Sequence, residues 1–185
     1  MKTAVLFPGI GYHCDKPLLY YAGKLARAAG YEVLSVPYTG FPKNIRNDRE
    51  KIREAIALAV EQTEQILMGQ KWSEQADILF ISKSIGTVAA SQYAMDKGLS
   101  VRSILFTPLP EAFEKAVLPA IAFHGTADPW AETGTLADAC QRKQIPLYRV
   151  EGANHSLETG DVMRDLQNLQ ETMKRVRRFI GENGQ

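Results

Sequence analysis

Short apolar segments alternate with longer amphipathic segments along almost the whole of this 185-residue chain. Such alternation is typical of a parallel sheet in which helices connect successive strands. The sequence therefore predicts an α/β fold, a three-layer α/β/α sandwich around a mostly parallel six-stranded sheet. We expect strands near residues 3–7, 32–37, 77–82, 102–106, 120–124 and 146–150, and helices near residues 17–29, 49–68, 85–97, 132–143 and 161–180.

The second expected helix carries apolar residues at helical spacing, which indicates a face directed to the core. These residues are Ile52, Ile56, Val60, Thr63 and Leu67. Before this helix, residues 37–48 form the longest irregular stretch of the chain. Because loops often carry binding residues, we expect this stretch to border a pocket.

The expected third strand runs into the segment Ser82-Lys83-Ser84-Ile85-Gly86, and a helix of small residues follows. A serine on a sharp strand-to-helix bend needs small residues two positions before and after it, so that the helix and strand can approach. Ser82 and Gly86 meet this requirement. The pattern predicts a nucleophile elbow with Ser84 at its tip. The alternative is a serine that caps an ordinary helix.

Two further polar residues follow apolar strands, in the chain order serine, acid, histidine that a triad on such a scaffold requires. Asp128 lies in the turn after the expected strand 120–124, and His155 lies in the loop after 146–150. A serine hydroxyl is a poor nucleophile at neutral pH, so a histidine must take its proton and a carboxylate must orient the ring.

With these segments the chain resembles the α/β-hydrolases, and among them the small members without a lid that are related to dienelactone-hydrolase-like and carboxylesterase proteins. The matching segments are 82–86, 124–129 and 152–155. The resemblance implies that Ser84 is the nucleophile, His155 the general base and then acid, and Asp128 the orienting carboxylate. It also implies that catalysis needs no metal and no organic cofactor.

A glycine-rich loop after the first strand, Pro8-Gly9-Ile10-Gly11-Tyr12, offers backbone donors for an oxyanion. The resemblance places the donating N–H at Ile10 or Gly11, opposite the N–H of Ile85. Loops of the family usually begin His-Gly, and this one begins Pro-Gly. The alternative is an ordinary glycine turn between a strand and a helix. Tyr12 is a candidate substrate-binding residue.

Other residues compete for roles in the site. Glu111 is the alternative acid of the triad, while His124 is more simply explained by a backbone hydrogen bond at its turn. His13 is expected at the surface, and Cys14 lacks the surroundings of a reactive thiol. Lys83 could add positive potential near an anionic substrate group, or belong to the scaffold.

Trp130 is the second candidate substrate-binding residue, because it follows Asp128 closely in the chain. It could form a wall of the acyl pocket or shield the acid, and packing at the strand end is the alternative. Only residues 107–119 separate the fourth and fifth expected strands, which leaves no room for a lid domain. An open site favours small or short-acyl substrates.

Composition agrees with a single domain over residues 1–185. The net charge of +1 gives no basic field for nucleic acid. The first apolar run is too short for a signal peptide or a membrane span, and the two cysteines suggest neither a metal site nor a disulfide framework. We therefore expect a cytoplasmic protein that contacts neither nucleic acid nor membrane.

The sequence thus predicts a serine hydrolase that cleaves small carboxyl esters or thioesters through an acyl-enzyme. The alternative is a protein that kept this scaffold to bind a ligand or a protein partner without catalysis. A homodimer contact could supply the pocket wall that the missing lid leaves out.

Overall fold

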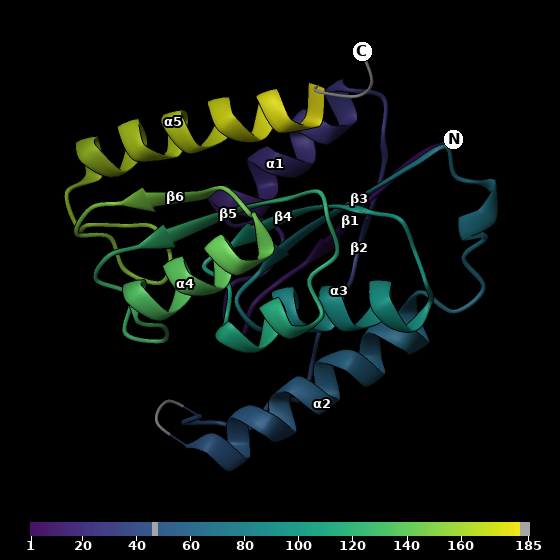
Figure 1. Cartoon of the computed structure of the whole chain (residues 1–185), viewed down its shortest axis with the longest axis horizontal. Helices are drawn as coiled ribbons and strands as arrows, with labels where there is room; N and C mark the ends of the chain where they lie inside the picture. The colour runs from purple at the N-terminus through teal and green to yellow at the C-terminus, as the bar shows by residue number, and fades with distance from the viewer. Residues whose placement is uncertain (46–47, 182–185) are drawn as a thin grey trace.

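The computed structural model describes residues 1–45 and 48–181, which form a six-stranded sheet between two layers of helices (Figure 1). The strand order is β2-β1-β3-β4-β5-β6, and every neighbouring pair is parallel. The predicted sandwich is confirmed, with a sheet that is parallel throughout. The strands are β1 (Lys2–Phe7), β2 (Glu32–Ser35), β3 (Asp77–Lys83), β4 (Arg102–Phe106), β5 (Ala120–Gly125) and β6 (Leu147–Val150).

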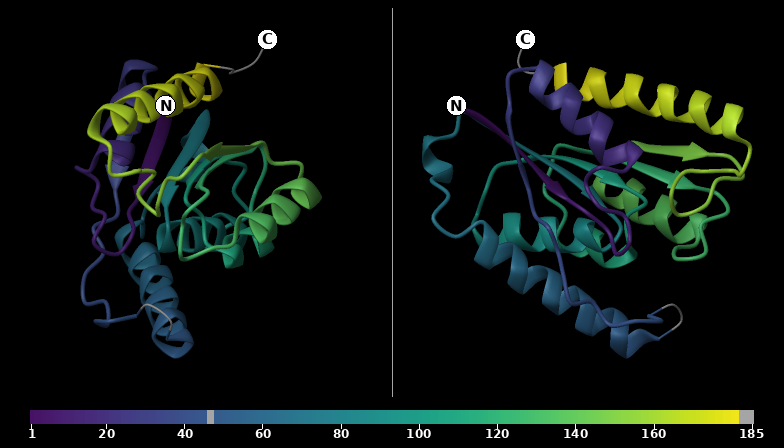
Figure 2. Two further views of the ribbon diagram at one scale, coloured as in Figure 1. Left: turned by 90° about the vertical axis from the view of Figure 1, so that its left-hand side faces the viewer. Right: turned by 180° about the vertical axis from the view of Figure 1, so that it is seen from behind.

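Five α-helices cover the two faces of the sheet (Figure 1, Figure 2). The first and last helices, α1 and α5, lie on one face and contact each other. On the other face lie α3 and α4, and α2 packs on the outer side of α3. The helices are α1 (Pro17–Ala28), α2 (Arg49–Ile66), α3 (Ile85–Asp96), α4 (Thr133–Lys143) and α5 (Val162–Gly181), with two short 3₁₀ helices, η1 (Trp72–Glu74) and η2 (Pro110–Glu114).

The middle strands are buried on both faces because helices cover both sides of the sheet. In β3 every residue after Asp77 is buried, and in β5 every residue is buried. Such strands read as continuous apolar runs rather than as alternating patterns, which is why their positions could be predicted within one or two residues. The strand expected at 32–37 ends earlier, at Ser35, and Pro37 has no N–H to extend the ladder.

The core face of α2 agrees with the prediction in part: Thr63 and Leu67 are buried, and Ile56 and Val60 pack against the core at its edge. The fully buried stripe is Ala55, Ala59 and Thr63, and Ile52 and Ile56 are only half buried. The two alanines belong to a cluster with residues of α3, where their small side chains allow a close approach of the two helices. Turning the small residues inward leaves the larger Ile52 at the edge of this contact.

No lid domain interrupts the sheet between β4 and β5, where residues 107–119 contain only η2. This part of the prediction is confirmed. Among the helices within residues 1–45 and 48–181, none has both the length and the apolar character that crossing a membrane requires. Of the irregular stretch 37–48, residues 46 and 47 lie outside the described part of the chain.

Candidate active site

Ser84 occupies the sharp turn between β3 and α3, with backbone angles of φ 55° and ψ −124°. A positive φ costs a serine conformational energy, so the surroundings must hold the turn in place. Two hydrogen bonds do so: the Ser84 N–H donates to the carbonyl of Phe106 (3.0 Å), and the hydroxyl of Thr87 donates to the carbonyl of Ser84 (2.6 Å). The geometry is that of the predicted elbow.

Small residues are required on both sides of this turn. A Cβ atom at Gly86 would lie 2.4 Å from the carbonyl oxygen of Phe7, so only glycine fits there. Ser82 is fully buried, and its hydroxyl donates to the carbonyl of Ile104 (3.2 Å). A serine is therefore accommodated at this position, because its one polar side-chain atom has a backbone partner on the neighbouring strand.

The structure brings Ser84, His155 and Asp128 together. The Nε2 atom of His155 lies 2.7 Å from the Oγ atom of Ser84, and its Nδ1 atom lies 2.7 Å from Oδ2 of Asp128. The imidazole therefore bridges the hydroxyl and the carboxylate with one ring nitrogen on each. Because a carboxylate only accepts, the proton of the neutral ring lies on Nδ1, which leaves Nε2 to accept from Ser84.

The carboxylate of Asp128 is fully buried and held from two sides. Besides the bond to His155, its Oδ1 atom accepts from the N–H of Trp130 (2.8 Å). His124 lies behind it, with Nδ1 3.8 Å from Oδ2, and its Nε2 atom meets the hydroxyl of Thr133 at 2.9 Å. The expected backbone partner of His124 is thus replaced by a threonine side chain.

The loops that carry Asp128 and His155 are joined by their backbones. The N–H of Ala127 donates to the carbonyl of Ala153 (2.9 Å), and the N–H of Gly152 donates to the hydroxyl of Thr126 (2.8 Å). These bonds hold the two loops at one separation. The alternative acid, Glu111, is an exposed residue of η2, whereas the carboxylate bonded to His155 is that of Asp128.

Two segments beside Ser84 offer backbone N–H groups, since Ile10 and Ile85 line the same cleft as the serine. Ile85 is the first residue of α3, where N–H groups have no partner within the helix. In the loop after β1, the N–H groups of Gly9 and Tyr12 bond each other's carbonyls, which leaves Ile10 and Gly11 as the candidate donors. Gly11 has φ 67°, a conformation that suits glycine.

A small cleft of about 110 Å³ opens directly beside Ser84. Most of the side chains that line it are apolar, and His155 is the one titratable side chain among the described residues that line it. The lining residues are Ile10, Ile45, Ile52, Ser84, Ile85, Leu109, Trp130 and His155. Trp130 therefore lies at the site as expected, with its ring 5.7 Å from that of His155.

Sequence reasoning missed three of these walls. Ile45 lies in the irregular stretch that is expected to border a pocket, but no local pattern distinguishes it from its neighbours. Leu109 lies between Pro108 and Pro110, in a loop without periodic spacing that could indicate its direction. Ile52 was assigned to the core face of α2, and its periodic spacing gave no sign of a position at the edge. Helical period alone does not tell which member of an apolar face meets a cleft.

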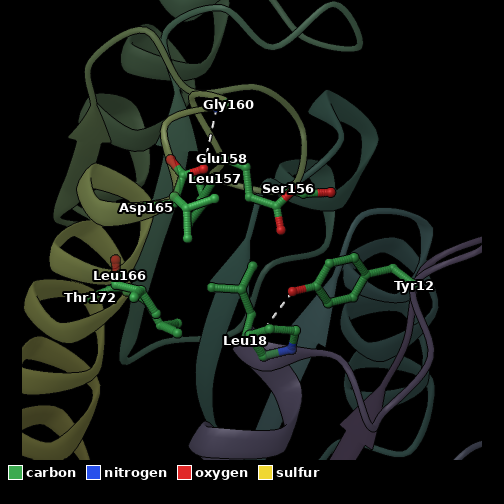
Figure 3. A pocket seen from close by; sticks show the side chains of 12 residues that line it. Tyr12, Leu18, Ser156, Leu157, Glu158, Gly160, Asp165, Leu166 and Thr172 are labelled. Atoms are coloured by element: carbon green, nitrogen blue, oxygen red, sulfur yellow. Dashed lines mark hydrogen bonds between the residues drawn. The ribbon is translucent and has the colours of Figure 1, made fainter.

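Tyr12 does not line this cleft. Its side chain is buried, and its hydroxyl accepts from the N–H of Leu18 (3.1 Å). It lies at the wall of a different, larger cleft of about 310 Å³ between the start of α1, residues 156–160 and the start of α5 (Figure 3). Tyr12 therefore packs beneath the loop of His155 rather than at the serine.

The remaining candidates lie away from the serine or are enclosed. His13 is exposed, and its Nδ1 atom lies 3.6 Å from Oδ2 of Asp15. Cys14 is half buried, and burial raises the pKa of its thiol. Lys83 is fully buried, so it offers no charge to a substrate in the cleft. Within residues 1–45 and 48–181, no three His, Cys, Asp or Glu side chains are grouped so that they could hold a metal ion.

Burial also sets the protonation of the histidines. It lowers the pKa of His155 below its ordinary value, and the hydrogen bond with Asp128 opposes that shift. The pKa of His124 is lowered by burial as well, again against the charge of Asp128. His155 is therefore neutral at pH 7, the form in which it can take a proton from Ser84.

Solved structures with the same arrangement of strands and helices identify the fold. An α/β serine hydrolase homologue from Coxiella burnetii superposes with a TM-score of 0.65 at 17% identity, over 95% of this chain and 84% of the other. An esterase from Pyrococcus furiosus superposes with a TM-score of 0.67 at 13% identity, over 97% of this chain and 82% of the other. This chain has the α/β-hydrolase fold.

A third neighbour is described as having no lid. It is a Xanthomonas campestris protein described as an α/β serine hydrolase without a lid, with a TM-score of 0.59 at 14% identity, over 94% of this chain and 81% of the other. No protein-family model matches the sequence, and no curated protein matches it. The likeness therefore lies in the α/β-hydrolase fold, and the chemistry must be argued from the site.

Proposed function

We propose that this protein is a serine hydrolase that cleaves small carboxyl esters or thioesters through an acyl-enzyme, with Ser84, His155 and Asp128 as its triad. The observation that carries the proposal is the position of one imidazole, 2.7 Å from a serine hydroxyl on one side and 2.7 Å from a buried carboxylate on the other. Nucleophile, base and orienting group stand within hydrogen-bonding distance in their required order.

The first half-reaction follows from these contacts. The Oγ atom of Ser84 attacks the acyl carbon while Nε2 of His155 takes the hydroxyl proton, and the carbonyl oxygen becomes an oxyanion. Collapse of this intermediate breaks the bond to the leaving alcohol or thiol, which takes the proton back from His155. The acyl group remains on Ser84.

The second half-reaction repeats these roles with water. Nε2 of His155 takes a proton from a water molecule, whose oxygen attacks the acyl carbon. The carboxylic acid leaves as Oγ of Ser84 recovers the proton. In both halves the buried charge of Asp128 stabilises the imidazolium that forms briefly beside it.

The oxyanion of each intermediate needs donors fixed before the reaction. The N–H of Ile85 at the start of α3 is one, with the favourable end of the helix dipole behind it. On the other side, the loop after β1 contributes Ile10, a cleft residue, or its neighbour Gly11. Removing one such donor typically costs about 10²–10³ in kcat.

The cleft supports a small apolar acyl group. Its volume of about 110 Å³ and its isoleucine, leucine and tryptophan walls suit a short hydrocarbon chain. A long lipid chain would extend into solvent, because no lid covers the site. Esters and thioesters suit the triad because their leaving groups depart readily. The alternative of a binding protein without catalysis is less well supported, since both bonds of the histidine are already formed.

A kinetic burst tests the proposal. When p-nitrophenyl acetate is mixed with the protein, rapid release of one equivalent of p-nitrophenol before a slower steady rate indicates an acyl-enzyme. The Ser84→Ala variant should fold normally and show neither the burst nor turnover above background. Equal hydrolysis by both proteins would exclude Ser84 as the nucleophile.

A further inference from the structure

A lysine side chain is enclosed directly beneath the candidate site. Lys83 is the last residue of β3, one position before Ser84, and it is only 2% exposed. Lysine is almost never fully buried unless its charge has partners, because an ammonium loses strong hydration on burial. Its burial here, at the end of a strand whose middle residues are apolar, therefore requires partners for the amino group.

The amino group of Lys83 contacts the loop that carries the histidine. Its Nζ atom donates to the backbone carbonyl of His155 over 2.8 Å. Its Nζ also lies 4.9 Å from the centre of the Tyr12 ring, and this cation–π contact stabilises the charged form of the amino group. Thus one side chain connects the residue preceding the nucleophile to the backbone of the general base.

The charges around this amino group come from several elements. Asp128 after β5 and Glu158 in the histidine loop attract it, and Lys16 before α1 repels it. Burial, with the smaller repulsion from Lys16, outweighs the two carboxylates and lowers the pKa of Lys83 to about 7. The amino group donates N–H to the carbonyl in either protonation state, so the contact does not require the charge, but the charge strengthens it.

We propose that Lys83 is a positioning residue: its buried amino group ties the backbone of His155 to the nucleophile turn and thereby holds Nε2 of His155 at hydrogen-bonding distance from Ser84. This inference rests on the proposed function and deepens it. Backbone hydrogen bonds fix the start of the loop from Gly152 to Glu158 to the loop of Asp128. At the histidine itself, the hydrogen bond from Lys83 fixes the loop to the nucleophile turn.

A second consequence is electrostatic. The charge of Lys83 disfavours a second positive charge on the neighbouring imidazole and so lowers the pKa of His155. At the acidic pH values where His155 titrates, Lys83 carries its proton. Loss of the lysine charge should therefore raise the pKa of His155. A residue that merely fills space would not have this effect.

The test compares Lys83→Met, which keeps length and apolar volume without a donor, with Lys83→Arg, which keeps a charged donor. In Lys83→Met we expect kcat for p-nitrophenyl acetate to fall on the order of tenfold to a hundredfold with KM changed little, because the base is misplaced. Lys83→Arg should recover part of this loss. The thermal midpoint of Lys83→Met should equal or exceed that of the wild type, since a buried charge is removed.

Titration of the histidine ring signals by NMR gives a readout that does not depend on turnover, and the chain has only three histidines to assign. We expect the pKa of His155 to rise in Lys83→Met, because the positive charge that lowers it is removed. A folded Lys83→Met protein with wild-type kcat and an unmoved His155 pKa would overturn the proposal. If Lys83→Met does not fold, equal kcat values in Lys83→Arg, which keeps a donor, and Lys83→Leu, which has none, would overturn it.

The two readouts separate this inference from the proposed function. A wild-type protein that does not hydrolyse the ester above background, whose His155 pKa still rises in Lys83→Met, would refute the hydrolase and retain the link between Lys83 and His155. A wild-type protein with a burst, in which both variants match it in kcat and in His155 pKa, would refute the positioning role alone.

Discussion

The carbonyl oxygen of Ala153 lies so close to Gly125 that a Cβ atom on that glycine would stand 2.3 Å away from it. Gly125 ends β5, three residues before Asp128, and Ala153 precedes His155 by two residues. The loop of the histidine therefore crosses the loop of the acid where the chain has no side chain. The separation between Asp128 and His155 depends on this contact.

A Gly125→Ala substitution should push the two loops apart. Backbone atoms cannot yield as a flexible side chain can, so we expect a loss of at least about 2 kcal/mol in the free energy of unfolding, together with most of the activity. Urea denaturation followed by circular dichroism measures the first quantity. An unchanged unfolding midpoint would contradict the account of this crossing.

Gly134 provides the matched control. It lies in the first turn of α4, and a Cβ atom there would be no closer than 3.7 Å to its nearest neighbour, a carboxylate oxygen of Glu132. Gly134→Ala should therefore stabilise the protein by about 0.4–1 kcal/mol, because it restricts the unfolded chain.

The choice of acid can be tested with two isosteric changes. Asp128→Asn keeps the shape but replaces the acceptor of the His155 Nδ1–H by an amide, so the ring loses its tautomer control. We expect kcat to fall on the order of 10⁴. Glu111→Gln, on the exposed surface of η2, should hydrolyse the same ester at the wild-type rate. The reverse outcome would show that Glu111 is the acid.

Activity should depend on pH through His155. Burial lowers the pKa of this histidine below 6.5, and only the neutral ring can accept the proton of Ser84. We expect kcat/KM to rise with pH to a midpoint below 6.5 and then to level off. A midpoint well above pH 7 would contradict the stated environment of the ring.

The lowered pKa of His155 also makes the free energy of unfolding depend on pH. Between the folded pKa and 6.5 the unfolded chain binds a proton at His155 more readily than the folded protein does. The free energy of unfolding contributed by this residue therefore decreases as the pH falls through that window. His124, whose pKa is also lowered by burial, adds to the decrease.

Ile52 should limit the length of the acyl chain. The Ile52→Ala substitution removes part of the side chain that lines the cleft beside Ser84 and so enlarges the cleft. The value of kcat/KM for an octanoyl ester should therefore rise about tenfold relative to that for an acetyl ester. Ile56→Ala removes the same atoms one turn further along α2, away from the cleft, and should leave the ratio unchanged. Equal ratios in both variants would exclude Ile52 as a wall.

Local sequence rules predicted the fold well because they agree with one another along this chain. Apolar runs bounded by turn residues located β3 and β5, and the small residues around Ser84 indicated the bend whose close contact with Phe7 the structure shows. The chain order of serine, acid and histidine then indicated which strand ends should meet.

What the sequence could not show depends on contacts between distant segments. The burial of Lys83 beneath the histidine loop and the inward turn of Ala55 in α2 both result from packing between elements. Tyr12 was expected at the substrate because it adjoins a glycine-rich loop. Its side chain instead points to the N–H of Leu18, a direction that no local pattern encodes.

The central claim, an activated serine at residue 84, is tested most directly by covalent labelling with a fluorophosphonate probe, with the adduct located by mass spectrometry. The account predicts one adduct on Ser84 in the wild type and none in Ser84→Ala, whose circular dichroism spectrum should match the wild type. A well-folded wild-type protein that takes up no probe, or takes it up at another residue, would contradict the account.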